Sequence, residues 1–403
     1  MKILMLSSTF PYPPTKGGTQ VRTFNLLRHL NQKHHVTLVT QKDNEIPEET
    51  IVALRGWVTE LKVFPREPVV EGGILNKIER FGKFWQQGTP PNVLHSYSVE
   101  IQKWIDKAVV AGKFEAITCE HSVNEIYVRP QWKRHLQTVV NIHSSVYRTC
   151  QNQLATATSE NKLRDRLYLP LLLRYEKRFC QKFSQIVVTT EEDRQQILTF
   201  NSQSKVAVIP NGVDLVTFPY RNTDPGGRQL IFFGGMDYIA NIDAACFFSR
   251  EILPILQAKY PGTTLTVVGS NPTPKVLALA ELPGIRVTGR VTSIAEYLHR
   301  ATICVVPMRT GFGIKNKTLE AMAAGTPVVG SDRGLEGIEV DRDGVPLRAL
   351  RANRVDEYVE AISRLFADAE LRATLSHNAR AMIEREYSWP NLAKRYEQVI
   401  IDR

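Results

Sequence analysis

The chain has 403 residues, of which 43% are hydrophobic and 23% are charged, and it includes 24 Gly and 22 Pro. This length predicts two or three compact domains and excludes a single small module, while the composition excludes a disordered or collagen-like chain. Lys and Arg outnumber Asp and Glu by 51 to 41, so the chain is basic, with a net charge of +10.

The first half of the chain alternates short apolar runs with helical patterns. A run at residues 2–8 predicts a buried strand that ends in a proline-rich loop, and Gly17-Gly18 precede a helical pattern that leads to a second run at 36–40. This is the pattern of a β-α-β unit. Further strands, separated by helix-length segments, favour a parallel, buried sheet and are expected at residues 116–119, 138–142 and 185–190.

Near residue 205 the pattern starts again, so the second half predicts another α/β unit of similar size, joined to the first around residues 206–214. Its apolar runs lie at 228–235, 264–270, 284–289, 302–307 and 326–331, and its helical patterns lie at 242–259, 293–300 and 316–324. From residue 355 onward the sequence predicts helices, the last of which spans about 389–402. We expect the active site where the two units meet, because open α/β sheets bind ligands at the carboxyl ends of their strands.

Cysteine spacing and the N-terminal segment bear on the compartment. The five cysteines form no CxxC pair and predict reduced, mostly buried thiols. The N-terminal apolar stretch is too short for a signal-peptide core, and no apolar run reaches about 18 residues. We therefore expect a cytoplasmic protein whose contact with a membrane would be peripheral, on its inner face.

Gly17 and Gly18 stand directly before the first predicted helix. Backbone N–H groups and the positive end of the helix dipole can face an anion or a sugar hydroxyl at this point. A dinucleotide fingerprint needs GxGxxG tight against the strand, whereas here a long glycine-free segment precedes the pair, which argues against a nicotinamide-dependent dehydrogenase. A plain loop with positive φ is the alternative.

Two histidines follow predicted strands, His121 after residues 116–119 and His143 after residues 138–142. Residues at the carboxyl ends of parallel strands point toward the ligand site, so each histidine can contact a substrate hydroxyl or stabilise developing charge. Asn124 lies just beyond His121. A structural histidine with satisfied hydrogen bonds is the alternative for each.

The most informative stretch is GFGIKNKTLEAMAAGTPVVGS at residues 311–331. A glycine-rich turn at Gly313 leads into a predicted helix that starts with Lys315 and Lys317, and Glu320 follows three residues later. A helix N-terminus beside two lysines suits a diphosphate, and a carboxylate one turn inside can accept hydrogen bonds from a ribose diol. A solvated, charged helix start is the alternative.

These motifs, in this order, resemble the retaining nucleotide-sugar glycosyltransferases of the GT-B fold, in particular glycosyltransferase family 4. The resemblance extends over nearly the whole chain. It rests on FPYPPxxGG after the first strand and on residues 174–197, 208–218, 232–244, 267–272, 287–291 and 315–329. It implies an α/β fold of two Rossmann-like domains that face each other across a cleft. The implied domains are residues 1–206 for the acceptor, residues 207–385 for the nucleotide sugar, and residues 386–403 as a helix that packs back on the first domain.

The resemblance also implies roles for individual residues. Gly17 and Gly18 match the loop near the donor phosphate and the acceptor. His121 matches the histidine that contacts the transferred sugar, and His143 matches the second histidine-bearing loop. Glu320 matches the glutamate that holds the nucleotide ribose.

Two departures from the family pattern affect the donor site. The first glutamate of the family's usual pair would stand eight positions before Glu320, where this chain has Phe312. The Arg and Lys that often follow the first strand of the second domain are replaced around Gly235, which we still expect to line the donor site, and Asn241. Neutralisation of the diphosphate must then rest on other cations. The candidates are Lys315, Lys317, Arg290 and Arg309.

One motif points to a different chemistry. Asp341-Arg342-Asp343 spells the DxD that metal-dependent GT-A transferases use, but it precedes Gly344 in a turn-like context, and we interpret it as a surface turn. GT-B enzymes stabilise the leaving diphosphate with helix dipoles and basic side chains, so we expect neither a metal nor a cofactor.

The basic excess lies in the first half, where residues 1–206 hold 28 basic and 19 acidic side chains. Within it, residues 162–183 carry seven basic and two acidic ones, interleaved with leucines. Such a stretch predicts a membrane-surface element, each near-surface cation contributing about 1 kcal/mol against anionic lipid. A core-facing helix with a solvated basic side is the alternative. Nucleic-acid binding is disfavoured, because the aromatic residues are not interleaved as a stacking platform.

The sequence therefore predicts a retaining glycosyltransferase that moves a sugar from a nucleotide-diphosphate sugar to an acceptor hydroxyl, in glycan, polysaccharide or glycolipid biosynthesis. Lys315, Lys317 and Arg290 would stabilise the departing diphosphate, and His121 would orient the sugar. His143 and Asn124 would contact the acceptor or the sugar. We expect a sugar, glycan or lipid-linked acceptor and an anionic membrane surface as partners, and no nucleic acid. The alternatives are a catalytically silent sugar-nucleotide-binding protein of the same fold and a GT-B sugar-nucleotide epimerase.

Overall fold

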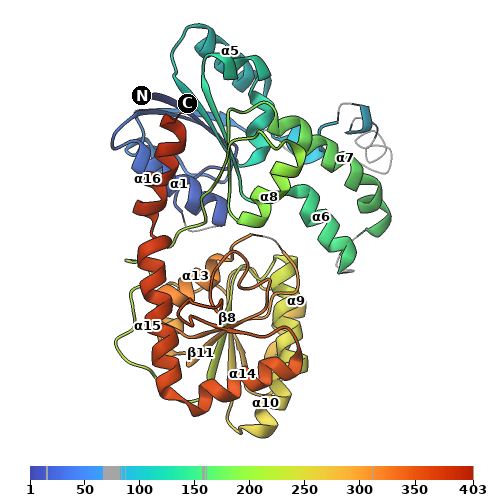
Figure 1. The fold of residues 1–403 in the computed structure, drawn as a ribbon, viewed down its shortest axis with the longest axis vertical. Coiled ribbons are helices and arrows are strands. Elements are labelled where there is room, and N and C mark those ends of the chain that lie inside the picture. Colours follow the sequence, from blue (N-terminus) through green and yellow to red (C-terminus); the bar gives the residue numbers. More distant parts are fainter. Residues whose placement is uncertain are drawn as a thin grey trace. The chain divides into compact units, whose positions relative to one another are not determined.

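The computed structural model describes residues 1–14, 17–66, 82, 84–86, 88–156, 159, 161–311 and 313–402. They form two compact units, the first made of Met1–Pro210 with Leu392–Arg403 and the second of Asn211–Asn391 (Figure 1). The first unit ends at Pro210 rather than at the expected residue 206 because β7 (Val206–Val208) is the last strand of its sheet.

The first unit is built on a parallel sheet. Its described strands follow the order β3-β2-β1-β4-β5-β6-β7. Their bounds are β1 Lys2–Ser7, β2 His35–Lys42, β3 Glu60–Pro65, β4 Ala116–Glu120, β5 Gln137–Ile142, β6 Gln185–Val188 and β7 Val206–Val208. Every position of β4, β5 and β6 is buried, which explains their continuous apolar runs and confirms the predicted sheet. The strand order reverses between β1 and β4, the point at which such sheets bind ligands.

The helices of the first unit follow the strands as predicted. They are α1 Gly18–Leu30, α2 Glu48–Arg55, α4 Pro91–His95, α5 Val99–Val110, α6 Val146–Ala155, α7 Lys162–Cys180 and α8 Glu191–Phe200, with 3-10 segments η1 Ser122–Tyr127 and η2 Pro130–Arg134. Polar side chains mark several helix starts, since Ser98, Ser145 and Thr190 each accept a hydrogen bond from the first turn of the helix that they precede.

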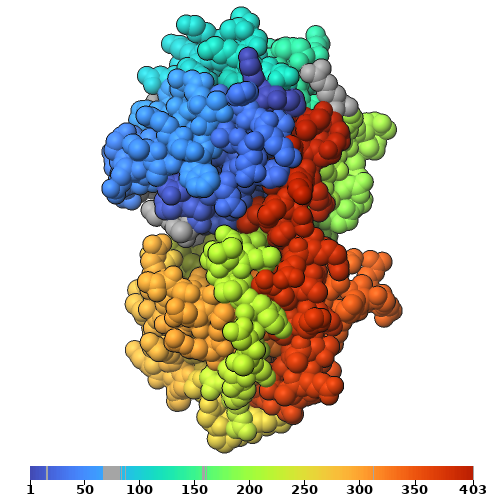
Figure 2. Space-filling model, turned by 90° about the vertical axis from the view of Figure 1, so that its left-hand side faces the viewer, coloured from blue at the N-terminus to red at the C-terminus, as the bar shows by residue number. Residues whose placement is uncertain are grey.

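The C-terminal helix α16, Trp389–Ile401, returns to the first unit. The hydroxyl of Tyr396 donates to a carboxylate oxygen of Glu120 over 2.5 Å. The carboxylate of Glu397 accepts from Lys33 Nζ at 2.9 Å and lies 3.1 Å from His29 Nε2. Figure 2 shows this helix, in red, against blue residues from the beginning of the chain.

The second unit repeats the same strand order. Its described strands run β10-β9-β8-β11-β12-β13, so the reversal point lies between β8 and β11. The bounds are β8 Gln229–Phe233, β9 Thr264–Val268, β10 Ile285–Val287, β11 Ile303–Val306, β12 Val328–Gly330 and β13 Leu350–Arg351. The helices are α9 Ile239–Phe247, α10 Leu253–Lys259, α11 Pro274–Leu277, α12 Ile294–Arg300, α13 Asn316–Ala323, α14 Val355–Ala367 and α15 Ala369–Glu386, with a 3-10 segment η4 Ala278–Glu281.

The predicted helix at 242–259 is divided in the structure. Between α9 and α10 the backbone forms a π-helical turn, η3 Phe248–Ile252. Pro254 in the first turn of α10 has no N–H to donate to this turn, which accounts for the wider hydrogen bonding there.

Candidate active site

Apart from Arg290, which follows β10, the predicted donor residues of the second unit lie at the carboxyl ends of β8 and β11 and at the start of α13. Gly235 follows β8 after one residue, and the turn that carries Gly313 follows β11 and leads into α13. Gly311 and Gly313 have φ values of 89° and 77°, in the left-handed region that glycine adopts without strain. The glycines therefore serve a turn that places the N-terminus of α13 at the reversal point of the sheet.

Glycine is needed at position 234 because the side chains of Asn241 and Lys317 lie close to its backbone. A Cβ atom at this position would lie 2.7 Å from Asn241 Nδ2 and 3.0 Å from Lys317 Nζ. The absence of a side chain thus lets both polar groups lie over the backbone at the end of β8. Gly235 continues this segment, and its carbonyl oxygen accepts a hydrogen bond from Asn241 Nδ2 at 2.8 Å.

Lys317 is a buried cation in the first turn of α13, with 9% of its surface exposed. Its Nζ donates to Asn241 Oδ1 over 2.5 Å and lies 4.5 Å from the ring centre of Phe232. Burial lowers the pKa of Lys317 to about 7, and the nearby charge of Lys315 acts in the same direction. A bound diphosphate would favour the charged form, so the site is suited to an anion.

Glu320 lies one turn further along α13 and is partly buried. Its carboxylate makes no hydrogen bond with any residue that the structure describes. Burial raises the pKa of Glu320 to about 7, while the charge of Lys317 opposes that shift. The carboxylate therefore remains available to a pair of ligand hydroxyls.

Lys315 directly precedes α13 and is held by the turn before it. Its Nζ donates to the carbonyl oxygen of Gly313 over 2.5 Å and lies 3.5 Å from Glu336 Oε2. Arg333 also contacts the Glu336 carboxylate, at 3.2 Å. The sequence did not predict Glu336 as a partner of Lys315, because Glu336 lies 21 residues further along the chain and belongs to no recognisable motif.

The two arginine candidates, Arg290 and Arg309, differ in whether they already pair with a carboxylate. Arg290 is exposed in the turn after β10 and forms no ion pair with the described residues. Arg309 pairs with the carboxylate of Asp243, at 2.9 Å from its Nε, and its guanidinium lies 4.7 Å from the ring centre of Phe247. Arg290 is therefore the arginine that could contact a ligand without losing a carboxylate partner.

Two further sequence predictions concern this unit. Phe312, which replaces the family's first glutamate, lies outside the described residues. Asp341 and Asp343 lie in an exposed turn, where the carboxylate of Asp341 accepts two hydrogen bonds from Arg351 at 2.7 and 2.8 Å.

In the first unit, the predicted histidines come together at the carboxyl ends of β4 and β5. The rings of His121 and His143 lie edge to face with their centres 5.1 Å apart, and Thr19 Oγ1 in the first turn of α1 lies 3.3 Å from His143 Nδ1. Burial lowers the pKa of His121 to about 4 and that of His143 well below its usual value. Both rings are therefore neutral at physiological pH.

The N-terminus of α1 borders this pair of histidines. Gly17 precedes the helix with an extended φ of 174°, so the alternative of a loop with positive φ is wrong at this position. Among the residues that the structure describes, none would lie within 4 Å of a Cβ atom on Gly17. The first N–H groups of a helix have no partner within the helix, so those of Gly18 and Thr19 can face a ligand.

Asn124 is engaged with the protein. Its Oδ1 accepts from the backbone N–H of Ser8 at 2.9 Å and from the Ser8 hydroxyl at 2.6 Å, and its Nδ2 donates to the carbonyl oxygen of Glu120 at 2.8 Å. The side chain therefore ties the end of β1 to the end of β4 and supports the loop that carries His121.

A buried network behind these loops was not predicted. Arg22 on α1 is fully buried and donates to Asn141 Oδ1 at 3.1 Å and to the carbonyl oxygens of Ile209 and Pro210 at 2.9 and 2.8 Å. Asn141 in turn donates to Glu120 at 3.0 Å. The available signal was a charged residue, Glu120, within an otherwise apolar strand directly before His121.

Helix α7 contains most of the basic stretch at 162–183. The two halves of this helix differ in the burial of their apolar side chains. Leu171, Tyr175 and Phe179 are buried, in keeping with the core-facing alternative. Leu163 and Leu167 are instead 71% and 52% exposed. Among the described helices, none has the length and apolar character needed to cross a bilayer.

Comparison with known proteins agrees with this architecture. Residues 16–217, about half the chain, match the model of Glycosyltransferase Family 4, and residues 227–368 match that of Glycosyl transferases group 1. The glycogen synthase of Mycobacterium tuberculosis is 28% identical over 208 residues, which are 49% of this chain and 49% of that protein. The chain thus spans about half the length of this curated relative.

Two solved structures share the fold. Sucrose-phosphate synthase from Thermosynechococcus elongatus has a TM-score of 0.69 at 19% identity, covering 99% of this chain and 98% of its own. Anabaena HepE, solved with UDP and glucose, has a TM-score of 0.66 at 15% identity and full coverage of both chains. These similarities confirm the α/β GT-B fold. With one family model covering half of its length, the chain belongs to glycosyltransferase family 4, among the group 1 glycosyl transferases.

Proposed function

We propose that this chain is a retaining glycosyltransferase that moves a sugar from a nucleotide-diphosphate sugar to an acceptor hydroxyl, in the synthesis of a glycan, polysaccharide or glycolipid. The arrangement at α13 carries the proposal, because a glycine turn leads into this helix, and the buried Lys317 and the available carboxylate of Glu320 lie within one helical turn of each other. HepE, a protein of the same fold solved with UDP and glucose, supports a nucleotide sugar as the donor.

The chemistry would begin with cleavage of the bond between the anomeric carbon and the diphosphate oxygen, through an oxocarbenium-like state. The acceptor hydroxyl attacks the anomeric carbon from the same face, and its proton passes to the departing diphosphate. Lys317, Lys315 and Arg290 stabilise the negative charge that develops on the diphosphate, together with the N–H groups at the start of α13. This electrostatic stabilisation requires no metal and no cofactor.

His121 would act on the sugar as a neutral group. Its low pKa of about 4 means that the ring offers a hydrogen bond rather than a positive charge at neutral pH. The Nε2 atom of His143 is buried and has no hydrogen-bond partner among the described residues. A hydroxyl of the sugar or the acceptor would satisfy this atom, which supports a role for both histidines in positioning the substrates.

The proposal is tested by measuring thermal stabilisation of the purified chain by UDP-, GDP-, ADP- and dTDP-sugars. A ligand at 100 times its dissociation constant stabilises by about 2.7 kcal/mol. Glu320→Ala should weaken binding of the preferred nucleotide sugar, and Lys317→Ala should slow its hydrolysis or transfer. Unchanged kinetics in both variants would show that the site is wrongly assigned. Binding without turnover would identify a silent sugar-nucleotide-binding protein, and an epimerised donor would identify an epimerase.

We also propose that the protein is cytoplasmic and binds the inner membrane face through the first half of α7. Leu163 and Leu167 lie on one face of the helix, four residues apart, and Lys162, Arg164 and Arg166 flank them. Exposed apolar side chains among cations suit an anionic lipid surface. Cosedimentation with vesicles of anionic phospholipid should fall when both leucines are replaced by Ser, and equal binding of the wild type to neutral vesicles would contradict the proposal.

A further inference from the structure

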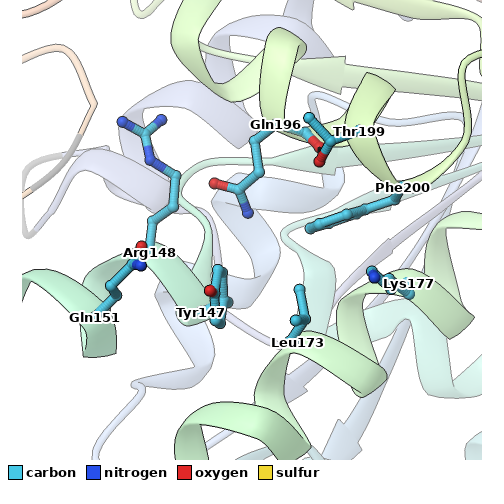
Figure 3. Close-up of a pocket in the computed structure, with 8 residues that line it drawn as sticks. All are labelled: Tyr147, Arg148, Gln151, Leu173, Lys177, Gln196, Thr199 and Phe200. Carbon is cyan, nitrogen blue, oxygen red and sulfur yellow. Dashed lines mark hydrogen bonds between the residues drawn. The ribbon is translucent and has the colours of Figure 1, made fainter.

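Side chains from three helices of the first unit line an open pocket, to which none of the active-site residues contributes (Figure 3). Its volume is about 350 Å³, near the lower end of the range for small-molecule sites. Side chains from α6, α7 and α8 converge on it. The residues that bear on its chemistry are Tyr147, Arg148, Gln151, Lys177, Gln196 and Phe200.

Two cations form part of the pocket wall. Lys177 is exposed, lies 5.8 Å from the ring centre of Phe200, and forms no ion pair with the described residues. Arg148 pairs with the Asp193 carboxylate through one nitrogen at 3.1 Å. The pocket therefore presents a charge that a negatively charged substituent could neutralise.

The carboxylate of Glu176, which contacts the Gln196 amide, is already satisfied by hydrogen bonds. Glu176 accepts from the Ser145 hydroxyl at 2.8 Å, from Gln196 Nε2 at 3.0 Å and from the Tyr147 N–H at 3.3 Å. Burial raises the pKa of Glu176 to about 7, so its negative charge at neutral pH is partial. Glu176 therefore adds only a partial negative charge beside Lys177, whereas the Asp193 carboxylate already pairs with Arg148.

The remaining lining groups suit a sugar. Tyr147 and Phe200 present aromatic rings that can cover the C–H face of a pyranose, and Gln151 adds an exposed amide. Since Gln196 Nε2 donates to Ser145 and Glu176, its Oε1 is left buried with no partner among the described residues. Figure 3 shows this amide among the lining side chains, where a ligand hydroxyl could donate to it.

The pocket lies close in sequence and space to the histidine loop. Tyr147 follows His143 by four residues, so their Cα atoms are no more than about 15 Å apart. The hydroxyl of Thr189 donates to the His143 carbonyl oxygen at 3.3 Å, and the next residue caps α8. The loop that positions His143 therefore leads directly into two walls of the pocket.

We propose that this pocket binds one acidic sugar unit of the acceptor, a pyranose that carries a carboxylate or a phosphate. The proposal rests on the proposed transferase function, because it assigns the pocket to the acceptor chain. The acidic group contacts Lys177 and Arg148, the ring lies against Tyr147 or Phe200, and a hydroxyl donates to Gln196 Oε1.

The test titrates the full chain, without donor, with tetragalacturonate and with the neutral maltotetraose, and it follows binding by calorimetry. We expect tetragalacturonate to bind at least about tenfold more tightly than maltotetraose at low salt, and the difference to shrink as salt rises. Competition by inorganic phosphate would assign the substituent as phosphate, whereas its failure to compete would assign a carboxylate. Equal affinities for the two oligosaccharides would overturn the proposal.

A matched pair of variants locates the binding. Lys177→Glu and Lys103→Glu make the same charge change at exposed helix positions, on α7 and α5, but only Lys177 lines the pocket. Lys177→Glu should weaken tetragalacturonate binding by about tenfold or more, and Lys103→Glu should leave it within about twofold. Equal losses in both variants would overturn the proposal, because they would indicate general charge attraction. Circular dichroism of both variants verifies that each is folded.

Donor binding, measured in the same preparation, separates this proposal from the transferase function. A chain that binds and turns over a nucleotide sugar but does not distinguish tetragalacturonate from maltotetraose refutes the pocket assignment alone. A chain that binds tetragalacturonate through Lys177 but binds no nucleotide sugar refutes the transferase function and leaves an acidic-sugar pocket without an acceptor role.

Discussion

Lys317 Nζ lies 2.5 Å from Asn241 Oδ1, although the two residues are 76 positions apart in the chain. The partner of this buried ammonium is thus a neutral amide, which cannot offset the loss of water around the charge, and the pKa of Lys317 falls to about 7. The protonation state of Lys317, a cation at the proposed diphosphate site, therefore depends on Asn241. In the sequence, Asn241 stands out only as a departure from the family pattern.

Asn241→Asp should raise the pKa of Lys317, because a carboxylate favours the charged form. If Lys317 stabilises the diphosphate as a cation, kcat/KM for the nucleotide sugar falls in the wild type as pH rises through about 7, and in the variant this limb moves up by about one pH unit or more. Rate profiles between pH 6 and 9.5 measure the shift. Asp243→Asn, on the same helix but in contact with Arg309, is the control and should not move the limb.

Glu320→Gln should stabilise the fold at alkaline pH while weakening donor binding. The folded-state pKa of Glu320 is raised to about 7 from 4.5, so its favourable contribution is present below about pH 4.5 and is lost as pH rises through 7. At pH 8 the variant avoids a buried negative charge and should gain on the order of 1 to 2 kcal/mol, with little change at pH 4. Urea unfolding at both pH values and a nucleotide-sugar titration measure the two effects. Lower stability at both pH values would refute this account of the carboxylate.

Glu397→Gln should destabilise the first unit above pH 5. Burial raises the pKa of Glu397, but hydrogen bonds from Lys33, His29 and His34 outweigh it and hold the value at about 2. Because this pKa is depressed, the stabilisation is present above the unfolded value of about 4.5 and is lost as pH falls toward 2. We expect a loss of about 1 to 3 kcal/mol at pH 7 and a smaller one at pH 3, measured by urea unfolding. A pH-independent loss would mean that packing, not charge, explains the effect.

Gly269→Ala should destabilise the second unit severely. A Cβ atom at this position would lie 1.7 Å from the carbonyl oxygen of Gly234, and neither backbone segment can move without disturbing β8 or β9. We expect a loss of about 3 kcal/mol or more in the free energy of unfolding, seen as a lower melting temperature. Gly56→Ala is the control, because its Cβ would meet only Ala53 O at 3.5 Å and φ is −67°, and it should be neutral or stabilising. Similar losses in the two variants would contradict this explanation.

The sequence allowed most strands to be predicted because parallel strands buried on both faces are continuous apolar runs, as at 116–119 and 138–142. β3 (Glu60–Pro65) was not predicted, because it is an edge strand whose half-exposed residues do not form a continuous apolar run. β7 was not predicted, because it has only three residues, too few to show a pattern of apolar residues, and it lies in a segment that we interpreted as a linker.

For the candidate site, the motifs predicted which residues gather but not what holds them. Lys315 and Lys317 were expected at a helix start, where the structure places them. The contacts of Lys317 with Asn241, and of Lys315 with Glu336, depend on how β8 and α13 pack, which no local pattern encodes. The pocket between α6, α7 and α8 was missed for the same reason, since its lining residues come from three helices.

The return of α16 to the first unit has a consequence for synthesis. Residues 1–210 leave the ribosome first, yet the tyrosine that satisfies Glu120 and the carboxylate that joins Lys33 emerge only after the whole second unit has been made. Until then the apolar surface against which α16 packs stays exposed to water and to other chains. The same holds for the Glu120 carboxylate, which is buried in the complete fold. The half of the protein that is translated first is therefore the half that finishes folding last, and it is the part that a chaperone would have to shield.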